Sequence, residues 1–384
     1  MPKTRIFVAN HDGEPIGRSG AISGEYSTVI TLHDRWADRA SWDDFVEGQE
    51  EARFSHLWDY GTVVECYGYE RRNICFSRGR EIVAVLPAVQ ARSVLFGRRL
   101  ISQPFSEYGG LLASDGLSDA DVTAMRDSLR DFLRGNGRYG TLELHGNHGV
   151  PAGLRDSLFS ATHGHRVAYL DVRRSADDLW RNVLNHSARK SVNKALKSGV
   201  VATEGCTEEL IRTEFFPLYL KSMKRLGSPP HKIEYYIRCL EAFGDRMQIF
   251  WAMFEGKRIA ALLGFACGSR VNIINTVSDS DYWSLCPNDL LHWEFIIKAA
   301  KGGFKYFDFG SVRYSGQDVF KKKWGCEMAD HKQYFLSGSD APTAARTFDS
   351  SGTTMSTASK LWAKYVPDSV STRLGPAIRQ QLMR

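Results

Sequence analysis

Apolar positions along the chain alternate between a period of two and helical spacing, and the pattern changes from one to the other many times. A period of two is typical of strands, and a spacing of three or four is typical of helices. In the first half, Ser41 precedes a run with helical spacing and is expected to be its N-cap. The elements predicted there are a strand at 26–34, a helix at 41–61, a hairpin of strands at 72–77 and 81–93, a helix near 117–135 and a strand at 140–146.

The second half repeats this mixed order. It begins with a strand, continues with three helical runs, and then has three successive strands before a further helix. Meanders of strands with helices between them predict a mixed α/β (α+β) fold that is present twice. The elements predicted there are strands at 166–172, 247–255, 258–268, 270–278, 306–309 and 332–337, and helices at 175–198, 207–225, 231–243 and 288–302.

The two ends of the chain differ in composition from the middle. Residues 1–25 are Gly-rich and polar, which indicates a loose lead-in, and 337–360 is rich in Ser, Thr, Gly and Ala, as linkers are. Residues 361–384 are basic and broadly amphipathic, and we expect a tail helix. This helix either docks on the protein or extends into solvent, or else contacts a membrane surface or a partner. The domains are then expected at 26–165 and 166–336.

Composition narrows the class of protein. The chain has 384 residues, of which 43% are hydrophobic and 24% charged, as in an ordinary globular protein. Its net charge of +6 suits an anionic substrate, an RNA or a membrane surface about equally well and does not choose among them. Seven scattered cysteines without a C-x-x-C pair indicate reduced thiols and neither a disulfide framework nor a zinc site. No apolar stretch resembles a signal peptide or a membrane span, so we expect a cytoplasmic protein. We expect no metal site, because spaced Cys and His pairs are missing.

Several catalytic motifs are missing. The sequence contains no G-x-S-x-G elbow, no H-E-x-x-H, no phosphate-binding P-loop and no G-x-G-x-x-G after a strand. It also lacks the [Q/R]-x-x-G-x-[G/A] stretch with which acetyl-CoA-dependent transferases hold a pyrophosphate at a helix start. What remains is a set of basic segments with aromatic neighbours.

The first basic segment is the predicted helix around "SARKSVNKALKSGV". Arg189, Lys190, Lys194 and Lys197 recur at helical spacing, and the chain has no acid between 178 and 204. This face is either simply solvated or takes its counter-charge from an anionic ligand.

The second basic segment is "YLKSMKRLGSPPHKIEYY", where Lys221, Lys224 and Arg225 end a helix before Gly227. The helix dipole accounts readily for one cation at a helix C-terminus, and less readily for three.

The third basic segment is "KYFDFGSVRYSGQDVFKKKWG". Asp308 ends an apolar strand, where it either caps the turn or serves chemistry. Lys321 follows Phe320, which we expect to be buried, so its backbone is fixed and its charge is aimed at a phosphate or carboxylate. Lys322 and Lys323 are expected to be solvent charges.

Three segments together resemble a known family: 85–113, 187–200 and 284–325. With "KRLGSPPHKIEYY", the chain is similar over about residues 40–336 to the FemAB-type, GNAT-like acyl and aminoacyltransferases. The resemblance is strongest to the subfamily found beside PEP-CTERM/exosortase and exopolysaccharide systems. It implies two tandem GNAT-like domains with a cleft between them and no tightly bound cofactor. The co-substrate is then aminoacyl-tRNA or acyl-CoA.

The resemblance also implies roles for residues. Lys321 matches a lysine associated with substrate phosphate, and Arg225 an arginine that holds the acceptor's diphosphate, while Arg189 and Lys190 match the start of the second domain. The family often reads "DFGRS" where this chain has "DFGSV", so the arginine is displaced and Arg313 is its candidate replacement. The coiled-coil arm that some cell-wall relatives use for tRNA is missing. Asn288, within the third matching segment, is a further candidate for substrate binding.

The resemblance implies N-acyl or aminoacyl transfer to an amine of a peptidoglycan-like or exopolysaccharide-related precursor. Such a reaction needs a proton acceptor, for which Asp308 is the candidate, and groups that hold two anionic substrates together. Lys321, Arg225 and Arg313 are expected to bind phosphate, and Lys224 is a further candidate for substrate binding. Tyr108 and Gly109 are expected to line the acceptor side. The alternatives are an acetyl-CoA enzyme with a degenerate motif and a non-catalytic RNA- or glycan-binding module. Expected partners are an anionic or glycan-precursor acceptor, charged tRNA and, through the tail, a membrane surface.

Overall fold

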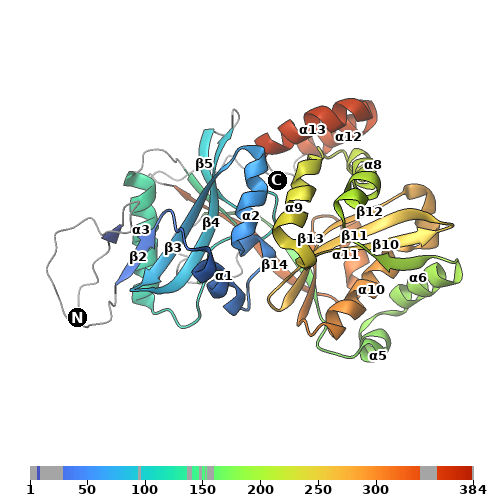
Figure 1. The fold of residues 1–384 in the computed structure, drawn as a ribbon, viewed down its shortest axis with the longest axis horizontal. Helices are drawn as coiled ribbons and strands as arrows, with labels where there is room; N and C mark the ends of the chain where they lie inside the picture. Colours follow the sequence, from blue (N-terminus) through green and yellow to red (C-terminus); the bar gives the residue numbers. More distant parts are fainter. Residues whose placement is uncertain are drawn as a thin grey trace. The chain divides into compact units, whose positions relative to one another are not determined.

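We describe the protein from a computed structural model. The described residues divide into two compact units, one within 7–164 and 331–337, the other within 165–330 and 353–382 (Figure 1). The prediction of a mixed α/β fold is confirmed, because each unit combines a sheet with helices. Within the described residues, which include all seven cysteines, no disulfide bond is formed. The residues that the structure describes are 7–8, 29–93, 97–135, 141–146, 149–151, 153, 160–337 and 353–382.

The sheet of the first unit has the strand order β1-β2-β3-β4-β5-β7-β14, and β6 pairs with β4. β14 belongs to this unit from His331 onward. The predicted hairpin is confirmed as β3 and β4, which pair antiparallel from Glu70 with Gln90 to Arg78 with Glu81. Helix α3 places Met125, Leu129 and Leu133 in the buried core of this unit, at the spacing of one helical face. The strands are β1 (Phe7–Val8), β2 (Ile30–His33), β3 (Glu70–Arg78), β4 (Glu81–Ser93), β5 (Gly97–Ser102), β6 (Leu112–Ala113), β7 (Thr141–His145) and β14 (Glu327–Ser337), and the helices α1 (Arg39–Gly48), η1 (Phe54–His56), α2 (Trp58–Val64), η2 (Glu65–Tyr67) and α3 (Asp119–Gly135).

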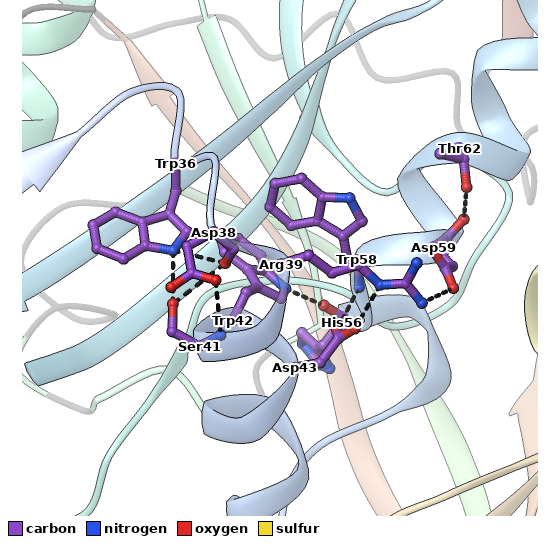
Figure 2. A network of polar contacts seen from close by, with 10 residues as sticks. All are labelled: Trp36, Asp38, Arg39, Ser41, Trp42, Asp43, His56, Trp58, Asp59 and Thr62. Atoms are coloured by element: carbon purple, nitrogen blue, oxygen red, sulfur yellow. Dashed lines mark hydrogen bonds and ion pairs between the residues drawn. The ribbon is translucent and has the colours of Figure 1, made fainter. Parts of the chain in front are cut away.

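The start of α1 is fixed by a polar network (Figure 2). The N-cap is Asp38, whose side chain accepts a hydrogen bond from the backbone N–H of Ser41 at 3.3 Å, so the prediction of Ser41 as N-cap is wrong by three residues. The indole of Trp36 donates to the Asp38 carbonyl at 3.0 Å. Arg39 then reaches Asp59 at 2.6 Å, which ties α1 to α2.

The sheet of the second unit has the strand order β8-β13-β12-β11-β10-β9. Neighbouring strands are antiparallel except β12 and β13, which are parallel. The strands are β8 (Ser160–Asp171), β9 (Val201–Glu204), β10 (Met247–Phe254), β11 (Lys257–Cys267), β12 (Arg270–Ser278) and β13 (Tyr306–Val312). The helices are α5 (Ala176–Asp178), η3 (Leu179–Val183), α6 (His186–Lys197), α7 (Glu208–Leu210), η4 (Ile211–Phe215), α8 (Phe216–Leu226), α9 (Ile233–Phe243), η5 (Gly244–Arg246), η6 (Ser280–Leu285), α10 (Pro287–Lys301), α11 (Ser315–Lys322), α12 (Thr353–Tyr365) and α13 (Asp368–Leu382).

Helices cover both faces of this second sheet (Figure 1). On one face, α6 and α10 pack against Val271 and Phe307 to form a buried apolar core. On the other face, the Tyr236 hydroxyl of α9 donates to Asn275 of β12 at 3.0 Å, and Phe243 packs against Phe265 of β11. Side chains on this second face therefore lie between the sheet and helices α8 and α9.

The tail differs from its prediction in extent. Helix α12 starts at Thr353, inside the segment expected to be a linker, and a second helix, α13, follows it. Both belong to the second unit, and a Cβ at Gly227 or Gly375 would overlap the carbonyl oxygen of Ser359 or the ring of Pro230. The two glycines therefore allow close docking of the tail on the α8–α9 connection. Within the described residues, no helix has the length and apolar character needed to cross a membrane.

Candidate active site

The parallel strands β12 and β13 pair over a short stretch and then separate, and we call this arrangement the fork. The two strands pair only at Arg270–Asn272 with Tyr306–Asp308, although β12 continues to Ser278 and β13 to Val312. β12 also bulges, because Gly264 and Leu263 of β11 pair with Ile273 and Asn275 and leave Ile274 as the extra residue. The inner edges of the two strands beyond the pairing are thus open to partners other than each other.

Asp308 lies at the base of this fork and is 2% exposed. Its Oδ1 accepts a hydrogen bond from the backbone N–H of Gly310 at 2.7 Å. Gly310 has φ 71°, and the pairing with β8 skips Phe309, so the carboxylate holds a bulge that only glycine adopts readily. The strand-end position predicted for Asp308 is therefore one in which the carboxylate is oriented by the backbone.

Asn272 is the residue that sequence reasoning missed. It is 1% exposed, and neither its amide nitrogen nor its amide oxygen has a hydrogen-bond partner in the described part of the chain. Its register partner is Asp308. A buried unpartnered amide costs free energy, so its presence indicates a function. The available signal was a polar residue within the apolar run "RVNIINTV".

Lys321 has a different immediate role from the predicted one. Its ammonium is buried and donates to the carbonyl oxygens of Phe309, Gly310 and Ser311 at 2.7, 2.9 and 2.5 Å. An ammonium has three N–H donors, and three backbone carbonyls of β13 accept from this one. Lys321, on α11, therefore contacts the backbone of the preceding strand, whereas the sequence predicted contact with a phosphate or carboxylate of a ligand.

The ring before Lys321 is partly buried, where the sequence predicted a buried ring, and it packs in an aromatic cluster. Phe320 packs edge-on against His292, which in turn stacks on Phe309 with ring centroids 5.3 Å apart. Burial lowers the pKa of His292 to about 3, and the nearby lysines 321 and 323 act in the same direction. The imidazole is therefore neutral, and it fixes α10 against β13 and α11.

The two lysines after Lys321 differ from each other. Lys322 is exposed and pairs with Asp318 at 2.7 Å, in line with a solvent charge. Lys323 is not a solvent charge, because it is mostly buried and forms an ion pair with Asp289. Its ammonium also lies 4.3 Å from the centre of the Phe320 ring.

The first turn of α10 has few backbone N–H groups that are free to bind a ligand. Pro287 at its first position has no N–H, and the N–H groups of Asp289 and Leu290 donate to the carbonyl of Cys286 at 3.2 and 3.4 Å. The Asp289 carboxylate adds negative charge in this first turn, and burial raises its pKa against the opposing effect of Lys323. This helix start is thus poorly suited to a pyrophosphate.

The other arm of the fork ends at Ser278. Asn288 donates to the Ser278 hydroxyl at 3.2 Å, and the indole of Trp283 donates to it at 2.8 Å. The guanidinium of Arg225 lies over the Trp283 ring, 4.5 Å from its centre, and the side chain is exposed. Asn288 and Arg225 are thereby brought to the same end of β12, while Asp308 and Lys321 belong to β13 and α11.

Arg313 lies in the loop after β13. Its Nε donates to the Ser311 hydroxyl at 3.2 Å, and its backbone N–H donates to Gln317 at 2.8 Å. It therefore stands beside the segment that Lys321 caps, on an exposed turn.

Two predicted substrate ligands have structural contacts instead. Lys224 donates to the carbonyls of Trp362 and Val366, at the end of α12. Arg189 donates to the carbonyls of Trp180, Arg181 and Leu184, at 2.8 to 3.0 Å. Both cations satisfy helix-terminal carbonyls, as the helix dipole favours.

The remaining cations of α6 stay available. Lys190, Lys194 and Lys197 are exposed, and no ion pair to them is seen within the described residues. The positive face predicted from the sequence is therefore present on α6, without the contribution of Arg189.

Tyr108 and Gly109 belong to the first unit. The Arg53 guanidinium lies 4.9 Å from the centre of the Tyr108 ring, and Gly109 has φ 119°. Two non-glycine residues of the same loop, Gln103 and Phe105, also have positive φ, of 39° and 68°. Strained backbone of this kind is concentrated at functional sites.

Comparisons with known proteins agree with this geometry. Residues 184–322, which contain the whole fork, match the family model of the acetyltransferase (GNAT) domain. No curated protein matches the sequence significantly. The structure is similar to that of FemX, with a TM-score of 0.63 and 13% identity over 78% of this chain and 96% of that chain.

Two further solved structures are similar. A conserved protein of unknown function from Bacteroides thetaiotaomicron has a TM-score of 0.54 and 12% identity, over 78% of this chain and 96% of that one. The C-terminal domain of a putative lysylphosphatidylglycerol synthetase from Agrobacterium fabrum has a TM-score of 0.50 and 12% identity, over 77% and 90%. At these identities the likeness shows the fold alone. The matched GNAT domain makes the chain an acyltransferase by enzyme class.

Proposed function

We propose that this protein transfers an acyl or aminoacyl group to an amine of a cell-surface precursor, of the peptidoglycan or exopolysaccharide type. On this proposal it is a FemAB-type enzyme, and the PEP-CTERM/exosortase-associated subfamily stays a prediction from the sequence. The observation that carries the proposal is the fork between β12 and β13, with Asn272 and Asp308 at its base.

The reaction needs a base and an oriented carbonyl. The amine nitrogen attacks the acyl carbon, a C–N bond forms, and the C–O or C–S bond to the donor breaks. The amine proton passes to a base, and the leaving oxygen or sulfur accepts a proton. We assign the base to Asp308, whose carboxylate the N–H of Gly310 orients. Asn272 supplies an amide that has no internal partner among the described residues and can bind the acyl oxygen or the amine.

The features of two helices favour an aminoacyl ester on tRNA over acyl-CoA as the donor. The start of α10, which follows the fork, has Pro287 and Asp289 where a pyrophosphate would need free N–H groups. Helix α6 in the same unit presents exposed lysines, for which the described residues supply no acidic partner, and this suits a polyanion.

The acceptor is proposed to be anionic. The guanidinium of Arg225 lies over the Trp283 ring on an exposed side chain, where it can meet a phosphate or carboxylate. One similar domain comes from a protein named as a synthetase of lysylphosphatidylglycerol, whose name describes an amino acid joined to a phosphate-bearing lipid. In the first unit, the strained loop with Tyr108 and Gly109 stays the proposed acceptor side.

The test is a product assay with both donor classes in parallel. The purified full chain is incubated with a mixture of charged tRNAs, or with a mixture of acyl-CoAs, and with amine-bearing peptidoglycan and exopolysaccharide precursors, and products are identified by mass spectrometry. We expect an aminoacylated precursor with tRNA, and its loss with Asp308→Asn. Acyl products from CoA donors alone, together with thermal stabilisation by acetyl-CoA, would assign the protein to the acetyl-CoA alternative.

The other possible outcome of this test is that the protein binds RNA or a glycan and catalyses no acyl transfer. Salt-sensitive RNA or glycan binding with no acyl product from either donor class would overturn the proposed enzyme activity and favour the non-catalytic module.

A further inference from the structure

The C-terminal hairpin of α12 and α13 has an inner face that is committed to the protein. Ser371 and Gly375 are buried, and Gly375 lies against Pro230. Arg379 donates to the Pro229 carbonyl at 2.8 Å, and Lys224 holds the end of α12. One side of each helix is therefore fixed, and the other side is presented to solvent.

The outer side is unusually apolar. Ten large hydrophobic side chains are exposed in the described part of the chain, and four of them lie in this short hairpin. Leu361 and Tyr365, one turn apart on α12, are 53% and 65% exposed, and Val370 and Leu374, one turn apart on α13, are 38% and 53% exposed. Scattered single apolar residues are normal on a surface, whereas a concentration of this kind marks an interaction site.

Basic side chains lie beside these exposed apolar side chains on α12 and α13. Residues 353–384 contain five basic residues and one acidic residue, a net charge of +4 out of the +6 of the whole chain. Lys360, Lys364 and Arg373 are exposed, and no ion pair to them is seen within the described residues. Each falls within one turn of an exposed apolar side chain on the same helix.

We propose that the outer face of the α12–α13 hairpin binds the surface of a membrane that carries anionic lipid. Leu361, Tyr365, Val370 and Leu374 enter the headgroup region, and the cations beside them contact lipid phosphates. Tyrosine and long basic side chains are suited to this boundary, since each has an apolar body and a polar end. The helices lie along the surface and do not cross it, in accordance with their length.

A second copy of the chain or an RNA are the competing occupants. A homodimer interface favours apolar residues with few charges at its centre, whereas here three cations are mixed with four apolar residues and net charge is strongly positive. An RNA would use the cations, but not the aliphatic side chains Leu361, Val370 and Leu374. An anionic lipid surface uses both kinds of side chain.

The test is co-sedimentation of the full chain with vesicles. Vesicles of phosphatidylcholine alone are compared with vesicles in which part of the lipid is phosphatidylglycerol, at low and high salt. We expect binding to the phosphatidylglycerol vesicles, weaker binding at high salt, and no binding to phosphatidylcholine alone. This assay needs no substrate, so its result is independent of the proposed enzyme activity.

Two sets of variants separate the contributions of the apolar side chains and of the cations to vesicle binding. The apolar set changes the four exposed side chains to Ser, and the charge set changes Lys360, Lys364 and Arg373 to Glu. Each is expected to lower the vesicle partition coefficient at least tenfold while thermal unfolding stays unchanged, because the side chains are exposed. Val319→Ser, at a side chain that is 69% exposed on α11, and Lys301→Glu, exposed on α10, are the matched controls and should bind as the unmodified protein does.

Three outcomes overturn the proposal. The first is absence of binding to the phosphatidylglycerol vesicles, and the second is equal loss of binding in the control variants. The third is a concentration-dependent dimer in light scattering that the apolar set abolishes while vesicle binding persists, which would assign the face to a second copy.

Discussion

The side chains of Asn272 and Asp308 lie opposite each other on one face of the sheet, at the last paired position before β12 and β13 separate. One is a buried amide without a partner among the described residues, and the other is a buried carboxylate oriented by a backbone N–H. Hydrophobic packing alone does not explain either residue, since both carry polar groups into a covered position. Their pairing at the base of the fork is the basis of the first prediction.

Asn272→Leu is expected to remove activity without loss of stability. The amide has no hydrogen bond to the described residues that could be removed, so an apolar side chain of similar size should leave the free energy of unfolding unchanged or raise it by about 1 kcal/mol. Turnover in the product assay should fall at least about tenfold. Denaturant unfolding and turnover are measured on the same preparation. A clear loss of stability would show that the amide has an internal role.

Asp308→Asn separates the charge from the hydrogen bond. The Asn oxygen can still accept from the Gly310 N–H, so the bulge is retained, while the proton acceptor is removed. We expect turnover to fall about 10²-fold or more with little change in the melting temperature. Unchanged turnover would exclude Asp308 as the base.

Lys321→Ala is expected to act mainly on stability. It leaves three β13 carbonyls without their donor and removes a buried side chain, which should cost about 3 kcal/mol in the free energy of unfolding. Lys322→Ala, the neighbouring exposed lysine, is the control and should cost less than about 1 kcal/mol. If Lys321→Ala lowered turnover while the melting temperature stayed the same, the phosphate role expected from the sequence would hold instead.

Acid should destabilise the protein through His292. Burial lowers its pKa to about 3, so between the unfolded value of 6.5 and about 3 the unfolded chain binds a proton that the folded chain does not. The stability contributed by the neutral ring is therefore present above pH 6.5 and declines as the pH falls, at up to about 1.4 kcal/mol per pH unit. In His292→Gln this part of the pH dependence should disappear, whereas His186→Gln, at an exposed position, should retain it. Denaturant unfolding at a series of pH values gives the free energy of unfolding of both variants. If this free energy changed with pH equally steeply in His292→Gln and in His186→Gln, His292 would not be the group that makes the protein sensitive to acid.

The positive face of α6 should bind the donor RNA. Replacement of Lys190, Lys194 and Lys197 by Ala is expected to weaken binding of charged tRNA, and the salt slope should fall by roughly 0.7–0.9 for each RNA phosphate that the variant no longer neutralises. Fluorescence anisotropy at several salt concentrations gives the slope. Lys301→Ala is the matched control, and an unchanged slope in the triple variant would show that the face is only solvated.

The order of elements was predictable because apolar periodicity is local. The hairpin of β3 and β4 and the strands around the fork follow from patterns a few residues long. The direction of the Lys321 ammonium was not predictable, since it depends on carbonyls that converge only when Gly310 takes its positive φ. The importance of Asn272 was equally hidden, because its partner Asp308 is separated from it by the whole of α10.

Long-range ion pairs and docking explain the other differences. Lys323 is buried because Asp289, on α10, supplies its counter-charge. Lys224 donates a hydrogen bond to a backbone carbonyl of α12, which is distant from it in the sequence. The first part of α12 lies in a segment whose composition suggested a linker. The sequence around either lysine carries no local pattern that predicts these partners.

The capping of β13 by Lys321 makes the fork one-sided. With the carbonyls of Phe309, Gly310 and Ser311 already bonded to the ammonium, that arm has few acceptors left, while the β12 arm retains its backbone groups beyond Asn272. On the proposed function, a substrate amide that enters the fork finds more free backbone acceptors on β12 than on β13. The residue that causes this difference, Lys321, lies outside both strands, on α11.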